Sequence, residues 1–157
     1  MKTIIGVDVG FSGAIAIWRD DCFVSIQDMP ILKDGKHTEL DEQGFVEIID
    51  SYDFTGMHIF IEKAQSMPGQ GISSTGRYLM SYGQIRGICA GLGVPYTLVH
   101  PRTWKKVMMP DMPKEKEASI IRARQLFPGL RFPLKRDHGK ADACLIAEYG
   151  RRNLKET

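Results

Sequence analysis

The amino-acid sequence predicts one α/β domain built around a mixed central sheet. Three short apolar runs follow one another near the N-terminus, at residues 3–9, 13–18 and 22–28, and short turns separate them. Beyond residue 40, helical and strand patterns alternate along the chain. No linker, repeat or low-complexity segment divides the 157 residues. We therefore expect a single domain over 1–157, with a three-stranded antiparallel meander, further parallel strands and flanking helices.

The first half of the chain supplies the meander and one further strand. The three N-terminal runs predict strands, with Asp20 and Asp21 in the second turn. A polar segment from Pro30 to about Glu39 predicts a loop, and the apolar spacing within residues 41–50 predicts a helix. Residues 57–61, Met-His-Ile-Phe-Ile, are β-branched and aromatic and predict a strand that terminates at Glu62.

The second half is mainly helical. A Gly, Ser and Pro-rich loop is expected over 67–75, followed by a helix over 76–92 that Gly93 ends and a strand over 94–100. Three more helices are expected: one beginning near residues 101–103, one over 114–126 and one over 141–152.

Composition limits the class of protein. Of the residues, 43% are apolar and 25% charged, enough for one continuous core, and no apolar run reaches the length of a membrane span. The N-terminus enters a strand pattern directly, without the features of a signal peptide. Cys22, Cys89 and Cys144 are far apart and form no CxxC pair, so we expect core or half-buried thiols in a reducing cytoplasm.

Charge is distributed unevenly along the chain. Residues 1–50 hold four Lys/Arg and ten Asp/Glu, whereas residues 101–140 hold eleven Lys/Arg and four Asp/Glu. A basic segment of this kind suits the phosphates of a nucleic acid. A solvated helix face is the alternative interpretation of the same pattern.

Three acidic residues lie in otherwise apolar surroundings. Asp8 is in the first strand, Glu62 ends a later strand, and Asp142 opens the last helix. A buried carboxylate is costly unless a cation lies beside it, and oxygen ligands suit Mg²⁺. Separately, each residue has an ordinary explanation: a turn for Asp8, an ion pair with Lys63 or an arginine for Glu62, and a helix cap for Asp142. Together they favour a metal site.

Four motifs carry a resemblance to a known family. In order and spacing, they are similar to those of the RuvC-type Holliday junction resolvases, of the ribonuclease H-like superfamily, over nearly the whole chain. The motifs are Ile5-Gly-Val-Asp-Val-Gly-Phe-Ser-Gly13, Ile61-Glu62, Gly83-Gln-Ile-Arg-Gly87 and Ala141-Asp-Ala143. Residues 101–106 and 113–116 are similar to stretches found in phage and phage-like members.

The resemblance implies a fold, an activity and a partner. We expect a ribonuclease H-like fold and a homodimer that resolves four-way DNA junctions in recombination and repair by paired nicks. Asp8, Glu62 and Asp142 would act in catalysis as ligands of two Mg²⁺ ions, which Mn²⁺ would replace, in phosphodiester hydrolysis. We expect a cytoplasmic enzyme, in a bacterial cell or a phage-infected host.

A fourth ligand is expected shortly before Asp142. Family members commonly have an acid or histidine three residues before this position, where this chain has Gly139. His138 lies one helical turn before Asp142 and would share its face, so we expect it to act as ligand and catalytic residue. Asp137 is the alternative if the chain before Ala141 is not helical.

The resemblance also implies DNA-binding positions. We expect Lys114 and Lys116 to face phosphate, with Lys105 and Lys106 extending the charged surface. Arg86 has two interpretations, contact with DNA or attachment of its helix to a neighbour. Glycines on the same helix, at 76, 83, 87 and 91, leave a groove suited to a second helix, as in a dimer contact.

Other functions remain open at this stage. The loop after Glu62 lacks an aromatic residue to open a junction, although Met67 or Ile72 could act as an apolar wedge. A broader nuclease for flaps and forks, a catalytically weak junction-binding protein and a ribonuclease H are therefore alternatives. An actin-like phosphotransferase would need a second domain, which 157 residues do not supply.

Overall fold

A five-stranded mixed sheet forms the centre of the molecule, in a computed structural model that describes residues 1–154. Its strand order is β3-β2-β1-β6-β7; β1 and β2, and β2 and β3, are antiparallel, while β6 lies parallel to both β1 and β7. The predicted meander and parallel strands are therefore confirmed. The strands are β1 (Thr3–Asp8), β2 (Ala14–Arg19), β3 (Cys22–Asp28), β6 (Met57–Glu62) and β7 (Tyr96–Val99).

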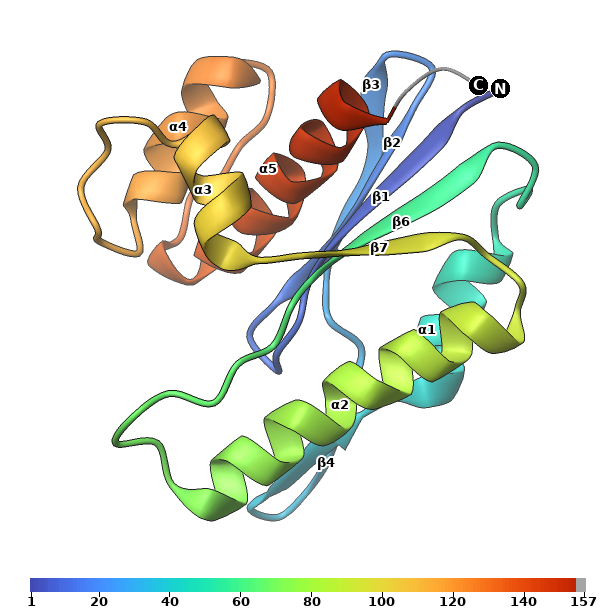
Figure 1. The fold of residues 1–157 in the computed structure, drawn as a ribbon, viewed down its shortest axis with the longest axis vertical. Coiled ribbons are helices and arrows are strands. Elements are labelled where there is room, and N and C mark those ends of the chain that lie inside the picture. The colour runs from blue at the N-terminus through green and yellow to red at the C-terminus, as the bar shows by residue number, and fades with distance from the viewer. Residues whose placement is uncertain (155–157) are drawn as a thin grey trace.

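Helices cover both faces of the sheet (Figure 1). One face is packed by α1 (Glu42–Asp50) and α2 (Ile72–Gly91), and the other by α5 (His138–Asn153), with α3 (Pro101–Met108) and α4 (Ala118–Leu126) beside it. A short 3-10 turn, Lys135–Asp137, leads into α5. None of the helices in residues 1–154 is both long and apolar enough to cross a bilayer.

Alternation along β1 decides which face each side chain joins. Ile5 and Val7 belong to the core under α1 and α2, while Ile4 belongs to the core under α3 and α5. Because successive strand residues point to opposite faces, Gly6 and Asp8 lie on the α5 side with Ile4. The carboxylate of Asp8 is thus directed toward the helix that carries Asp142.

The close approach of α5 to β1 depends on Gly6. A Cβ atom at this position would overlap the carbonyl oxygen of Ala143 and lie 2.6 Å from the backbone nitrogen of Ala147. Backbone atoms of a helix cannot move aside as a side chain can. The absence of a side chain at Gly6 therefore sets the depth at which α5 lies on the sheet.

The prediction of a loop at residues 30–39 is wrong, because this segment forms a β-hairpin. Strands β4 (Ile31–Asp34) and β5 (His37–Leu40) pair antiparallel as a separate two-stranded sheet. Asp34-Gly35 is a common turn dipeptide, and Gly35 has a φ of 59°. The polar residues hid this strand pattern, since only one residue of each strand, Ile31 or Leu40, packs toward the core.

The predicted starts of three helices and the predicted burial of one cysteine were also wrong. α2 begins at Ile72 rather than 76, α4 at Ala118 rather than 114, and α5 at His138 rather than 141. Cys89 and Cys144 are buried free thiols, as expected. Cys22 is exposed, because it lies at the start of the edge strand β3.

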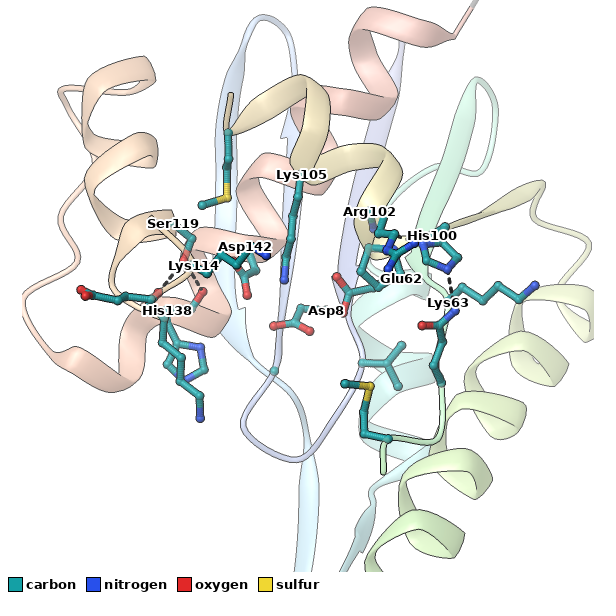
Figure 2. Close-up of a pocket in the computed structure, with 18 of the residues that line it drawn as sticks. Asp8, Glu62, Lys63, His100, Arg102, Lys105, Lys114, Ser119, His138 and Asp142 are labelled. Carbon is teal, nitrogen blue, oxygen red and sulfur yellow. Dashed lines mark hydrogen bonds between the residues drawn. The ribbon is translucent and has the colours of Figure 1, made fainter. Parts of the chain in front are cut away.

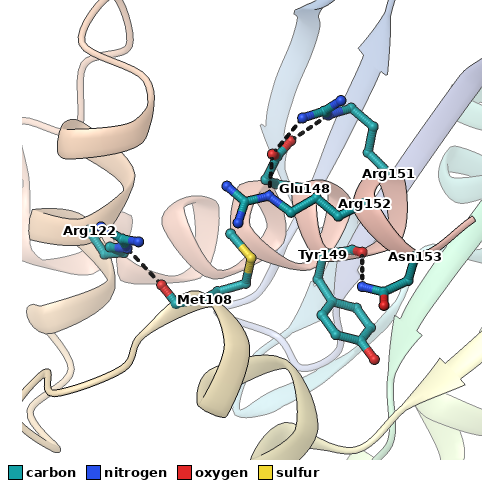
Figure 3. A network of polar contacts seen from close by, with 7 residues as sticks. All are labelled: Met108, Arg122, Glu148, Tyr149, Arg151, Arg152 and Asn153. Atoms are coloured by element: carbon teal, nitrogen blue, oxygen red, sulfur yellow. Dashed lines mark hydrogen bonds and ion pairs between the residues drawn. The ribbon is translucent and has the colours of Figure 1, made fainter.

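The end of α5 carries a compact ionic network (Figure 3). Glu148, whose side chain is 4% exposed, accepts hydrogen bonds from Arg151 at 2.7 and 2.8 Å and from Arg152 at 2.8 Å. Burial acts to raise the pKa of Glu148, but the hydrogen bonds and charges of the two arginines outweigh it and lower the pKa. The ionised form is therefore favoured by folding.

The stabilising effect of Glu148 should be lost in acid. A lowered folded-state pKa stabilises the native protein above the ordinary pKa near 4.5, and this contribution disappears as pH falls through the folded value. We expect Glu148→Gln to cost about 1–2 kcal/mol at pH 7, since the arginines are partly solvated and screened. Denaturant unfolding of both proteins from pH 7 to 3 should show the difference shrinking. A difference independent of pH would contradict this account.

Candidate metal and nucleic-acid site

Three parallel strands bring polar residues to one edge of the sheet. β1 ends at Asp8, β6 ends at Glu62, and His100 follows β7 directly. Parallel strands have their carboxyl ends at the same edge, which in such folds is the usual place for a ligand. Glu62 shares the α5 side of the sheet with Phe60, two residues earlier in its strand.

The fifth residue of α5 completes this group. Asp142 lies inside the helix rather than capping it, so the cap interpretation is wrong. His138, one turn earlier, is the first residue of the helix and lies on the same side, as the spacing predicted. Figure 2 shows Asp8, Glu62, Asp142 and His138 around one open space.

A cavity of about 1260 Å³, here called the main cavity, contains all four side chains. Its walls come from the ends of β1 and β6, the loop after Glu62, α3, the segment before α4, and the start of α5. The floor is acidic and the walls are basic. Such a distribution suits a polyanion brought close to a group of cations.

The carboxylates on this floor disfavour one another's ionised forms. Burial raises the pKa of Asp8 well above its ordinary value, and the charges of Asp142 and Glu62 raise it further. Burial likewise raises the pKa of Glu62 and raises that of Asp142 to about 7. Tyr78, beside Asp8 and Glu62, has its pKa raised to about 12 by burial and by these two charges. The ionised forms of these three carboxylates are therefore disfavoured unless positive charge lies beside them.

Lys105 supplies positive charge that partly offsets these effects. Its charge lowers the pKa of Asp8, Glu62 and Asp142 alike. Figure 2 shows its side chain extending from α3 between Asp142 and Glu62. The ammonium also lies 5.5 Å from the centre of the Trp104 ring, a cation–π contact. One monovalent charge is opposed by three carboxylates, so the floor can accept further positive charge.

The donor chemistry fits a hard divalent cation. Among residues 1–154, no three His, Cys, Asp or Glu side chains are close enough to form a ready-made metal cluster. Mg²⁺ needs no such cluster, because it commonly binds through one or two carboxylates, waters and substrate phosphates. Asp8, Glu62 and Asp142 supply oxygen donors. Their pKa values are raised, and a bound Mg²⁺ would lower them by stabilising the ionised carboxylates.

The two alternatives for a fourth ligand have different positions. His138 lines the main cavity, and its pKa is lowered by burial and by the charge of Lys116. Asp137 is 6% exposed and accepts a hydrogen bond from the backbone N–H of Leu134 at 2.9 Å. Asp137 is not among the residues that line the cavity. The geometry favours His138 over Asp137.

Gly139 has a structural reason for replacing the expected acid. A Cβ at Gly139 would overlap the carbonyl oxygen of Ser12 and lie 3.2 Å from the Cα of Gly13. The start of α5 thus packs directly on the turn between β1 and β2. A carboxylate at residue 139 would force the helix away from Asp8.

Trp104 holds Glu62 in place, a contact that the spacing of the motifs did not predict. The Trp104 indole N–H donates a 2.7 Å hydrogen bond to Glu62 Oε2, and the ring is completely buried. This hydrogen bond lowers the pKa of Glu62 against the effect of burial. In the described residues Glu62 forms no ion pair with Lys63 or any arginine, so the ion-pair interpretation is wrong.

Six cations form the walls of the main cavity, here called the basic rim. Four of them are lysines that the sequence analysis predicted to bind DNA. The other two, Lys63 and Arg102, were not among the predicted DNA-binding residues. Lys63 comes directly after the end of β6, and Arg102 comes three residues after the end of β7. A cation shortly after a strand end was therefore the sequence signal for both. The basic rim consists of Lys63, Arg102, Lys105, Lys106, Lys114 and Lys116.

Arg86 lies outside this site. It is exposed on α2, its guanidinium is 5.3 Å from the centre of the Tyr82 ring, and contact with Tyr96 raises its pKa. These contacts favour the second interpretation, in which Arg86 attaches α2 to β7. Met67, 63% exposed, lines the main cavity, whereas Ile72, 93% exposed, does not.

The fold of this chain is similar to that of RuvC. RuvC of Thermus thermophilus, in a structure with a Holliday junction substrate, matches with a TM-score of 0.66 at 12% identity, over 97% of this chain and 96% of that one. A second Thermus thermophilus RuvC structure matches with a TM-score of 0.54 at 14% identity, over 96% of this chain and 95% of that one. These similarities confirm the predicted fold.

A sequence relative points the same way. The chain is 36% identical over 92 residues to the chloroplastic Holliday junction resolvase MOC1 of Chlamydomonas reinhardtii. The match covers 57% of this chain and 10% of the relative, so the chain spans only a small part of that protein. No family model matches the chain. The resemblance to RuvC-type resolvases is confirmed by this relative and by the shared fold.

Proposed function

We propose that this protein is a Mg²⁺-dependent endonuclease that resolves Holliday junctions by hydrolysing a phosphodiester in each of two strands. The carrying observation is that Asp8, Glu62 and Asp142 converge on the floor of one cavity with a basic rim. The shared RuvC fold and the relative named as a Holliday junction resolvase support the choice of substrate.

Each residue of the site would have a separate role. Asp8, Glu62 and Asp142 would hold two divalent ions, and His138 would complete the site. The bound ions would neutralise charge on the scissile phosphate and make water more acidic, and Mn²⁺ would also serve. Trp104 keeps the Glu62 carboxylate oriented, and Lys105 limits the repulsion among the acids before substrate arrives.

The basic rim would position the DNA. Lys105, Lys106, Lys114 and Lys116 line the cavity around the acids, where their ammonium groups can contact phosphates on either side of the scissile bond. Contacts to phosphate orient the backbone without reading its sequence. Binding should accordingly weaken steeply with salt.

Paired nicks require two such sites, so we propose a homodimer. The α2 glycines expected to approach another helix have no neighbour within the described residues: a Cβ on Gly76, Gly83, Gly87 or Gly91 would meet nothing within 4 Å. This leaves the glycine surface open to a second copy of the chain. We also propose that the enzyme acts in the cytoplasm, where branched DNA arises during replication and recombination.

The proposal is tested by substrate competition. The wild type should cut an immobile four-way DNA junction in the presence of Mg²⁺ or Mn²⁺, giving symmetrically paired nicks, and EDTA should stop the reaction. A fork, a flap and an RNA:DNA hybrid serve as competing substrates. Preference for fork or flap would replace junction resolution with a broader branched-DNA nuclease. Tight junction binding without metal-dependent cleavage would instead identify a junction-binding protein.

Loss of the Trp104 indole N–H should lower the affinity for the metal ion more than the affinity for DNA. Trp104→Phe removes the 2.7 Å hydrogen bond to Glu62 while keeping an aromatic ring in the buried position. Groups that orient metal ligands commonly contribute about 10–100-fold to affinity or activity. We expect the half-saturating Mg²⁺ concentration for cleavage to rise by about that factor, and Mn²⁺ affinity measured by calorimetry to fall in parallel.

Trp18→Phe is the matched control. Trp18 packs edge-on against Phe23 with ring centres 5.1 Å apart, in an aromatic group away from the main cavity. It should change thermal stability without changing the metal requirement. Equal metal requirements in wild type and Trp104→Phe would show that Trp104 only fills the core.

A further inference from the structure

A second cavity adjoins the main one and has a different composition. It measures about 580 Å³ and lies between the turn after β1, the β4–β5 hairpin and the start of α2. Its charged lining residues are Lys33, Lys36 and Arg77, and no Asp or Glu lines it in the described part of the chain. A cavity with only positive charge is suited to an anion.

The hairpin separates its charges by face. Lys33 pairs with Thr38 across the two strands, and both line the second cavity. Asp34 pairs with His37 and Leu32 with Glu39, and these residues are exposed on the opposite face. Because side chains alternate across a strand, the two acids of the hairpin are directed away from the cavity that its lysines face.

The three cations also lack an ion-pair partner among the residues that the structure describes. None of Lys33, Lys36 and Arg77 forms an ion pair within residues 1–154. Arg77, on α2, faces the lysines from the other wall and is only partly exposed. Three uncompensated cations facing one space repel one another, and an anionic ligand would relieve this repulsion.

The second cavity is continuous with the main one. Val9, Ser12, Gln70 and Tyr78 line both. Tyr78 lies between them, and its phenol hydroxyl can donate a hydrogen bond to phosphate. A chain of phosphates leaving the acidic floor could therefore continue past Tyr78.

We propose that the second cavity binds the sugar-phosphate backbone of the same branched DNA, beyond the nucleotides at the cleavage site. Lys33 and Lys36 from the hairpin and Arg77 from α2 each contact phosphate, and Tyr78 marks the passage from the main cavity. This inference rests on the proposed function and adds a second anchoring site to it. It also gives a function to the hairpin, which contributes little to the core.

The test measures how junction binding depends on salt. Each lost phosphate contact removes about 0.9 from the slope of log affinity against log salt for duplex DNA. With cleavage blocked by EDTA, Lys33→Gln/Lys36→Gln should bind a fluorescent four-way junction several-fold more weakly than wild type. Its slope should be shallower by about 2, and that of Arg77→Gln by about 1.

A charge-matched control separates specific contacts from net charge. Lys2→Gln/Arg131→Gln also removes two exposed positive charges, but from positions that line neither cavity. The control should keep the wild-type slope. Equal losses in the two double variants, or an unchanged slope in the hairpin variant, would overturn the second cavity as a DNA site.

The same experiment distinguishes failure of this inference from failure of the proposed function. A wild type that binds and cuts the junction, with hairpin and Arg77 variants that behave like the control, would refute only the second site. A wild type that neither binds nor cuts any branched DNA would refute both. Circular dichroism of each variant checks that the hairpin substitutions leave the fold intact.

Discussion

Substitution Asp8→Asn should abolish junction cleavage while leaving junction binding intact or slightly tighter. The pKa of Asp8 is raised by burial and by the charges of both other carboxylates, so its ionised form depends most on a cation bound beside it. Metal ions contribute several kcal/mol to such hydrolysis, and each 1.36 kcal/mol is a tenfold change in rate. We expect a loss of at least about 10³-fold, measured under single-turnover conditions with excess protein.

The stability of the same variant provides an independent reading. In metal-free protein, Asn at residue 8 removes a charge that Asp142 and Glu62 repel, so the melting temperature should rise above that of wild type. Asp34→Asn, on the outer face of the hairpin, should change neither cleavage nor the melting temperature. Glu62→Gln and Asp142→Asn should repeat the loss of cleavage. Normal cutting by any of the three would remove that residue from the catalytic group.

Gly6→Ala should destabilise the protein strongly. The new Cβ would overlap the Ala143 carbonyl oxygen and lie 2.6 Å from the Ala147 nitrogen, so α5 must move outward. Overpacking in a rigid core costs about 1–3 kcal/mol, and we expect the upper end or more because the obstructing atoms are backbone. Denaturant unfolding measures this loss.

The same substitution should damage the site. Outward movement of α5 carries Asp142 away from Asp8, so cleavage should fall further than stability alone explains at a temperature where the variant is fully folded. Gly129→Ala is the control: Gly129 is exposed in a loop away from the site, and its Cβ would meet nothing within 4 Å, so the variant should be as stable as wild type or more stable by up to about 1 kcal/mol. A Gly6→Ala protein as stable as wild type would show that this contact does not determine how closely α5 packs on the sheet.

Many residues of the site could be predicted because they lie at or near strand ends, which an apolar run in the sequence identifies. An acid that terminates an apolar strand, as Glu62 does, indicates a polar edge of a sheet. Four of the five predicted DNA-binding cations do line the main cavity: Lys105, Lys106, Lys114 and Lys116. Arg86 differs because its neighbour Tyr96 is on another element, and no local pattern reveals that contact.

The loop predicted at residues 30–39 was wrong, and the glycine at 139 had no explanation in the sequence. Short strands of mostly polar residues, such as β4 and β5, lack the apolar alternation that identifies a half-buried strand. Gly139 looked like a missing ligand, but the turn at Ser12 and Gly13 occupies the space that a side chain would need. Both cases depend on which distant segment packs nearby.

Sequence alone determined which five segments form the central sheet, the acidic donors and the basic segment, because each depends on periodicity, residue type or charge along the chain. Only the tertiary structure decided that Asp142 faces Asp8, that His138 rather than Asp137 borders the main cavity, and that Trp104 binds Glu62. It also created the second cavity from the hairpin and Arg77. These features join residues far apart in the chain, and packing, rather than local preference, sets their distances.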